Sequence, residues 1–134
     1  MKQTLFSLLL LVVLGFHQDP ASPKKVELGK EFTIKIGQKV VVKDTQLKIK
    51  FTAVSEESRC PEDVTCVWSG NAKVNLDVVF KKKSSAVALN THLIPKENSF
   101  KGYTVKLISL TPTPRSGQPI NPAEYEATLI VTNK

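Results

Sequence analysis

Residues 47–53 of the chain read LKIKFTA, and along this stretch apolar and polar side chains alternate without interruption. One side of an extended segment would carry Leu47, Ile49, Phe51 and Ala53. Successive side chains of a β-strand point to opposite faces, so a period of two is typical of a strand with one buried and one solvated face. This stretch therefore predicts a half-buried strand at the surface of a β-sheet.

Six further segments repeat this alternation, and turn residues such as Gly37 and Asp44 separate them. They span residues 32–36, 39–43, 72–80, 85–92, 103–110 and 125–131. Residues 94–102 and the proline-rich stretch 112–122 are expected to be loops, and no segment has the period of an amphipathic helix. About seven strands predict an all-β fold, namely an antiparallel two-layer β-sandwich around one core. A partly open barrel is the alternative architecture.

Residues 1–15 have the pattern of a secretory signal peptide. Lys2 supplies a positive charge, residues 5–14 are apolar apart from Ser7, and small side chains precede a cleavage point after Gly15. The apolar run is shorter than the roughly 20 residues that span a bilayer, so no membrane span is expected. No cysteine near the cleavage point is available for a lipid anchor. The mature chain is therefore expected to be soluble, and either secreted or periplasmic.

The chain divides into three expected parts. Residues 1–15 are the signal peptide, residues 16–25, which include Pro20 and Pro23, are an irregular leader, and residues 26–134 form a single β-sandwich domain. A total length of 134 residues suits one domain.

The chain is basic, with 19 Lys and Arg against 12 Asp and Glu and a net charge of +7. Many lysines fall on outward strand positions, among them Lys35, Lys48 and Lys50, where charge keeps a sheet soluble and protects its edges. A nucleic-acid site would place exposed aromatic side chains between the basic ones, whereas here the aromatics mostly occupy inward positions. We therefore expect no nucleic-acid partner and no cofactor, and at most a weak attraction to anionic surfaces.

Residues 58–70 read SRCPEDVTCVWSG and contain both cysteines and the single tryptophan of the chain. Two cysteines in an exported protein predict a disulfide, here between Cys60 and Cys66. So short a ring contributes only about 2 kcal/mol by chain entropy, so the bridge is expected to shape a local loop. Pro61 stiffens the same ring because its φ angle is restricted.

The residues after the ring carry two further expectations. Trp68 follows Cys66 by two positions, so its indole is expected to pack over the disulfide or cap the core, with an exposed ligand platform as the alternative. Gly70 is expected to permit a turn or a close backbone approach. The candidate binding loop therefore comprises Arg59, Pro61, Glu62, Asp63, Trp68 and Gly70.

The motif RCPEDVTCVWSGNA, with Arg59, Cys60, Pro61, Val64, Cys66, Trp68 and Gly70, resembles the signature of a family of small exported bacterial proteins. The segments GQKVVVKDTQLKIKFTAVSEESRC, GYTVKLISLTPTP and YEATLIV are also similar to that family, so the resemblance covers most of the mature chain. Many of its members are lipoproteins, and this chain departs from them because it lacks an anchoring cysteine. Since the family has no established activity, the resemblance implies only the fold and the compartment.

No catalytic constellation is visible in the sequence. The chain has no serine in a nucleophile elbow and no free cysteine beside a base, and His92 stands alone. The spacing of Cys60 and Cys66 does not suit zinc, and the acidic residues around the ring lack the glycine-containing pattern of a calcium loop. We therefore expect no enzymatic activity, no catalytic residue and no metal ligand.

The remaining interpretation is a binding or accessory protein of the bacterial envelope. Its expected partner is an unidentified protein or small ligand, and the chain is expected to be a monomer. One alternative is a protease inhibitor that presents the disulfide-closed loop Arg59–Cys66, because a rigid loop loses little entropy on binding. A metal-binding envelope protein is the further alternative.

Overall fold

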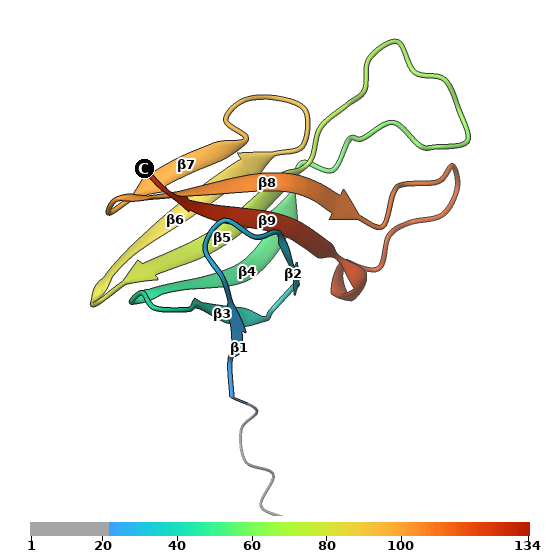
Figure 1. Cartoon of the computed structure of the whole chain (residues 1–134). Helices are drawn as coiled ribbons and strands as arrows, with labels where there is room; N and C mark the ends of the chain where they lie inside the picture. Colours follow the sequence, from blue (N-terminus) through green and yellow to red (C-terminus); the bar gives the residue numbers. More distant parts are fainter. Residues whose placement is uncertain (1–21) are drawn as a thin grey trace, which may run out of the picture.

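The computed structural model describes residues 22–134 (Figure 1). The expected signal peptide, residues 1–15, and residues 16–21 of the expected leader lie outside this range. Nine strands and one short 3-10 turn, η1 (Pro122–Glu124), make up the regular structure of the described residues. The strands belong to two sheets.

The five-stranded sheet has the order β1-β3-β4-β5-β6 and the four-stranded sheet the order β2-β9-β8-β7. The first contains, in that order, Lys24–Val26, Lys39–Val42, Leu47–Ser55, Lys73–Phe80 and Lys83–Asn90. The second contains Phe32–Lys35, Glu126–Asn133, Tyr103–Thr111 and Glu97–Phe100. All neighbouring strands are antiparallel except β1 and β3, which run parallel.

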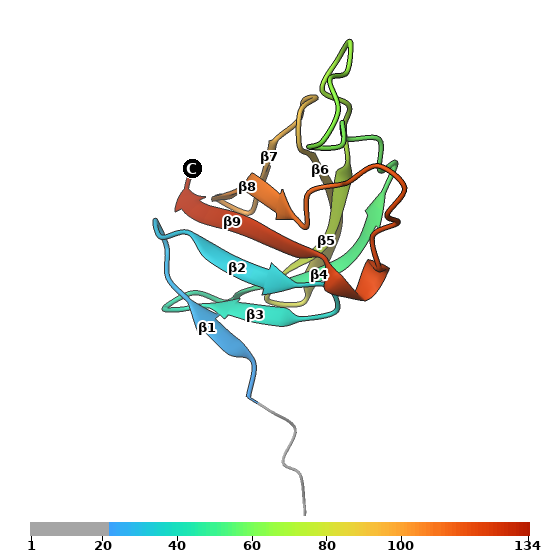
Figure 2. The same ribbon diagram turned by 90° about the vertical axis from the view of Figure 1, so that its right-hand side faces the viewer.

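The two sheets form separate layers, which Figure 1 and Figure 2 show from two directions. Alternate residues of the strands fill the space between them, and the largest fully buried side chains include Phe51, Ile34, Leu47, Ile49, Leu76 and Leu129. Burial of one such side chain contributes about 1.5–3 kcal/mol. The predicted all-β two-layer sandwich is confirmed. Each sheet has its own hydrogen-bond ladder, so the sandwich, and not the partly open barrel, describes the fold.

The seven predicted strands are all present within two residues of their predicted bounds, and two short strands are additional. β1 includes Lys24 and Lys25, which the sequence assigned to the irregular leader, and β7 lies inside the predicted loop 94–102. Only Val26 of β1 is buried, and β7 has only the half-buried Phe100. Both strands pair at the edge of a sheet. Neither is long or apolar enough to produce an alternating pattern in the sequence.

Two β-bulges change which side chains face the core. The pairing of β4 with β5 shifts between Phe51 and Ala53, so Ala53 is exposed although the alternation placed it inward. The pairing of β8 with β9 shifts between Leu107 and Ser109. A bulge inserts one extra residue and resets the alternation beyond it. As a result Leu107 and Leu110 are both buried, and Ile108 between them is 41% exposed.

Candidate functional site

The segment with the two cysteines, residues 56–72, connects β4 to β5 and projects from one end of the sandwich (light green in Figure 1). We call it the disulfide loop. Cys60 and Cys66 form the predicted disulfide within it, with Cα atoms 5.9 Å apart. Residues 62–69 are all exposed. The loop thus stands away from the core and is held by contacts at its base.

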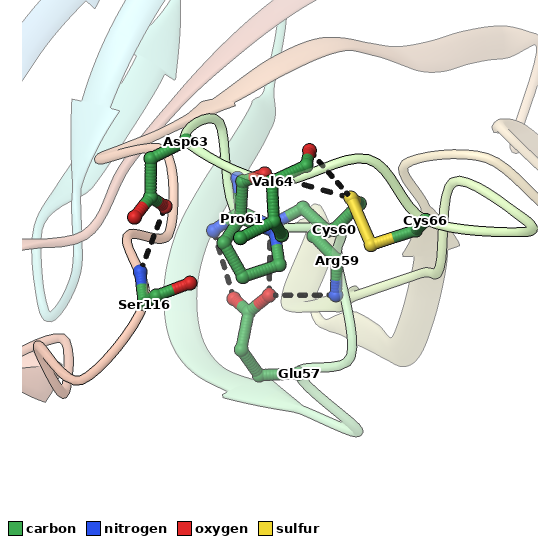
Figure 3. Close-up of a disulfide and its surroundings, with 8 residues drawn as sticks. All are labelled: Glu57, Arg59, Cys60, Pro61, Asp63, Val64, Cys66 and Ser116. Atoms are coloured by element: carbon green, nitrogen blue, oxygen red, sulfur yellow. Dashed lines mark hydrogen bonds and ion pairs between the residues drawn. A yellow bond between two sulfur atoms is a disulfide. The ribbon is translucent and has the colours of Figure 1, made fainter.

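Arg59 is the first of these contacts, and its side chain is buried (9% exposed). The guanidinium donates from Nε to Oε1 of Glu57 and from Nη2 to Oε2, both at 2.8 Å (Figure 3). It also donates to the carbonyl oxygens of Leu110 at 2.7 Å and Pro112 at 3.0 Å. Arg59 therefore joins the disulfide loop to the end of β8 in the opposite sheet.

Arg59 was predicted to be a member of the candidate binding loop, and the structure shows that its side chain is buried at the base of that loop. All three nitrogens of its guanidinium group donate within the protein. A protease would need a displayed basic side chain at this position, and the structure turns it inward instead. The physical reason is that the carboxylate of Glu57, two residues earlier, and two free carbonyls at the end of β8 satisfy the guanidinium better than partial exposure does.

Glu57 is the acidic partner in this cluster and accepts a further hydrogen bond from the hydroxyl of Tyr125, at 3.0 Å. Burial acts to raise the pKa of the Glu57 carboxyl, but the hydrogen bonds and charge of Arg59, helped by Tyr125, outweigh it and hold the pKa below its usual value. Burial and the hydrogen bond to Glu57 raise the pKa of Tyr125. At neutral pH the cluster is therefore a carboxylate between a cation and a neutral phenol.

Gly70 closes the neck of the disulfide loop. Its φ angle is +70°, and a Cβ atom added to it would lie 1.8 Å from the carbonyl oxygen of Ser58. The two arms of the loop meet here through hydrogen bonds from Ser58 N to Asn71 O (2.7 Å) and from Cys60 N to Ser69 O (2.9 Å). The close backbone approach expected at Gly70 is present.

Asn71 is a buried polar residue that the sequence analysis did not single out (4% exposed). Its amide nitrogen donates to Oδ1 of Asn90 at 2.8 Å, and its Oδ1 accepts from the backbone of His92 at 3.0 Å and Leu93 at 3.1 Å. The segment 91–96 is thereby held against the base of the disulfide loop. An asparagine in a loop carries no pattern that would have predicted this role.

Glu62 and Asp63, both expected to be binding residues, attach the disulfide loop to the proline-rich loop. The backbone nitrogen of Glu62 donates to the carbonyl of Pro114 at 2.9 Å, and its carboxylate pairs with Arg115 at 3.2 Å. The carboxylate of Asp63 accepts from the backbone nitrogen of Ser116 at 2.9 Å (Figure 3), which lowers its pKa. Together with Pro61, a half-buried member of the ring, these residues shape the loop.

Trp68 is not part of the buried core, so the expectation that it caps the core is not met. Its side chain is 56% exposed, and its neighbour Val67 is fully exposed. Trp68 belongs to the run of residues 62–69, all of which are exposed. The exposed platform, which was the alternative for Trp68, describes its position.

Large apolar side chains are exposed together at this end of the molecule. Within residues 22–134 the exposed ones are Val64, Val67, Trp68, Leu93, Ile94 and Ile108. They come from the disulfide loop, the segment 91–96 and the bulge of β8. A hollow of about 390 Å³ lies between these three segments, with Ser69, His92 and Ile108 among its lining residues. We call Val64, Val67, Trp68, Leu93 and Ile94 the apolar tip.

The sequence analysis missed Val64, Val67, Leu93 and Ile94 as candidate binding residues. Exposed valine, leucine and isoleucine residues have no motif, and in a β-rich chain they are normally assigned to strands. The sequence does contain one indication of their exposure: these apolar residues fall outside every segment in which apolar and polar side chains alternate.

Comparison with protein-family models, with curated proteins and with solved structures found no match to this chain. No helix among residues 22–134 has the length and apolar character to cross a bilayer. In the described part of the chain, no three His, Cys, Asp or Glu side chains lie close enough to share a metal ion. The site is therefore interpreted from its own geometry.

The Glu57–Arg59 pair predicts a specific acid sensitivity. Glu57 has a lowered pKa in the folded state, so its contribution to stability is present above the unfolded pKa and is lost as the pH falls through the folded value. The Glu57→Gln variant should lose about 2 kcal/mol of unfolding free energy at about pH 7, and this loss should shrink toward about pH 3. Urea unfolding at both pH values measures it.

The exposed pair of Glu62 with Arg115 provides the control for this experiment. The Glu62→Gln variant should differ from the parent by less than about 1 kcal/mol at either pH. A loss in Glu57→Gln that stays constant across the pH range would contradict the assignment of the pair.

Two glycines with the same backbone angle predict different costs for an added methyl group. Gly70 and Gly117 both have a φ angle of +70°, but a Cβ atom on Gly117 meets nothing within 4 Å. The Gly117→Ala variant should lose about 1 kcal/mol, from the left-handed backbone alone. Gly70→Ala should lose about 3 kcal/mol or more, because the neck of the loop must also open. Equal losses in chemical denaturation would show that the neck is not tightly closed.

The position of Trp68 can be tested by fluorescence, because it is the single tryptophan of the chain. Its emission in the folded protein should already be that of a solvated indole, and iodide should quench it nearly as well as it quenches the urea-unfolded chain. Cleavage of the disulfide by a reductant should change this little. A blue-shifted, iodide-protected emission in the folded protein would place the indole in the core instead.

Proposed function

We propose that this protein is an exported, non-enzymatic binding module that recognises a protein partner through the apolar tip. The proposal rests on one observation. Within residues 22–134, the exposed large apolar side chains come from three segments at one end of the sandwich, and three of them, Val64, Val67 and Trp68, lie on the disulfide loop.

Single exposed apolar residues are ordinary on protein surfaces, but a group of them is typical of an interaction site. Tryptophan in particular is enriched among the few residues that carry most of the binding energy at protein interfaces. Trp68 and its neighbour Val67 offer such an anchor without rearrangement, since both are already exposed.

The loop is also prepared for binding by its covalent and polar restraints. The disulfide closes the ring, Arg59 attaches its base to β8, and Asp63 attaches its side to the proline-rich loop. A loop that is restrained before binding loses less conformational entropy on association, so more of its contact energy appears as affinity.

The two alternative functions, a protease inhibitor and a metal-binding protein, are less well supported by the structure of the disulfide loop. The inhibitor hypothesis depends on a displayed Arg59, and that side chain is buried against Glu57. The metal hypothesis depends on cysteine thiolates, and both cysteines of the chain are in the disulfide. The apolar tip supports neither chemistry.

The test is capture of partners from an envelope extract by the immobilised mature protein, compared with a variant of the tip. The double variant Val67→Ser/Trp68→Ser should lose about 30-fold or more in affinity for the captured protein, since an interface anchor contributes at least about 2 kcal/mol. Its melting temperature should stay unchanged, because neither side chain is buried.

The control variant Ala53→Ser/Ala86→Ser makes the same kind of change at exposed positions of β4 and β6. It should bind as the parent does. If the tip variant captures the same protein with unchanged affinity, the binding surface lies elsewhere and the proposal fails.

A further inference from the structure

The end of the sandwich opposite the disulfide loop is formed by hairpin turns (Figure 1). The turn between β5 and β6 contains Lys81 and Lys82, with Lys83 at the start of β6, and the turn between β7 and β8 contains Lys101. A hollow of about 730 Å³ lies between these turns and is lined by Gln46, Phe80, Lys81, Lys82, Lys83 and Lys101. We call it the lysine hollow.

The hollow combines positive charge with an aromatic surface. Nζ of Lys81 lies 5.5 Å from the centre of the half-buried Phe80 ring, which in turn lies 5.8 Å from the ring of Tyr103. Lysine stems are themselves apolar and add to this surface while their ammonium groups remain in water. The residues that line the hollow therefore combine ammonium groups with an aromatic and aliphatic surface.

The four lysines have no acidic neighbour that neutralises them. The lysine and arginine ion pairs within residues 22–134 involve Lys30, Lys35, Arg59, Lys73 and Arg115. No carboxylate lines the hollow. Four like charges at one place repel one another, and an anion is the ligand that relieves this repulsion.

Two of these lysines occupy hairpin-turn positions with an unusual backbone angle. Lys81 has a φ angle of +55° and Lys101 one of +50°, in the left-handed region that glycine or asparagine normally occupies at hairpin turns. A lysine in this conformation costs about 1 kcal/mol relative to glycine. Two-residue hairpin loops require such angles, and Asp44 and Glu56 also adopt them. The backbone therefore explains only why Lys81 and Lys101 lie at the tips of turns that line the same hollow.

We propose that the lysine hollow binds the phosphate groups of anionic lipid headgroups. A phosphate on a carbon body suits a rim of ammonium groups around an aromatic base better than a free inorganic ion, which would use the charge alone. The four lysines are exposed and lie on hairpin turns at the end of the sandwich, the part of the protein that a membrane surface would meet first in this orientation. The inference is independent of the apolar tip, which would point away from such a membrane.

The experiment is sedimentation of the mature protein with vesicles at low ionic strength. Vesicles containing phosphatidylglycerol should bind it, whereas vesicles of phosphatidylcholine alone should not, and added salt should release it. The triple variant Lys81→Gln/Lys83→Gln/Lys101→Gln should bind about 100-fold more weakly, as expected for the loss of three lysines near an anionic surface.

The matched control removes the same charge from another place. Lys39, Lys48 and Lys50 line a separate shallow hollow on the five-stranded sheet, together with Asp77. The Lys39→Gln/Lys48→Gln/Lys50→Gln variant should keep most of the affinity, a reduction of less than about 10-fold. Equal weakening in both triple variants would mean that total charge alone causes binding, and it would overturn the proposal.

A second arm distinguishes the source of the phosphate. Soluble polyphosphate is added to the protein with and without vesicles. Vesicle binding that depends on the hollow, and that polyphosphate displaces only at high concentration, supports the lipid headgroup. Binding of polyphosphate without binding of phosphatidylglycerol vesicles would overturn the lipid assignment, as would binding to neither. Melting temperatures confirm that both triple variants are folded.

Discussion

The buried pairing of Arg59 with Glu57 is the contact on which the arrangement of the functional end depends. A guanidinium removed from water is unfavourable unless a carboxylate and further acceptors surround it, and here Glu57 and two carbonyl oxygens at the end of β8 do so. Because Leu110 lies in β8 and Pro112 directly follows it, the contact joins the disulfide loop to the four-stranded sheet. Together with the backbone hydrogen bonds at the neck, it holds the base of the disulfide loop.

The molecule has two chemically different ends joined by a rigid body. The disulfide loop and the segment 91–96 expose apolar side chains, whereas the hairpin turns at the other end carry the lysines around Phe80. The sandwich between them is densely packed with branched apolar residues such as Ile34, Ile49 and Leu129. Under the two proposals, the protein would hold a membrane surface at one end and a protein partner at the other.

Much of the fold could be predicted, because it depends on a local pattern. Alternation over seven segments predicted seven strands, the two-layer sandwich and most of the core. The errors have specific causes. β1 and β7 are too short and polar to alternate, and the bulges in β4 and β8 shift the pattern by one residue, which exposes Ala53 and buries Leu110.

The sequence located the disulfide loop but not the environment of its individual side chains. The sequence by itself determined the strands, the disulfide and the location of the unusual loop, since these depend on residues close together along the chain. Only the tertiary structure decided that Arg59 is buried and Trp68 exposed. The acceptors of Arg59 in β8 and the loop beyond it lie 51 and 53 residues away, and the indole belongs to the exposed run of residues 62–69. The exposure of a side chain depends on neighbours that are distant in the sequence, and a local sequence pattern does not predict which residues these will be.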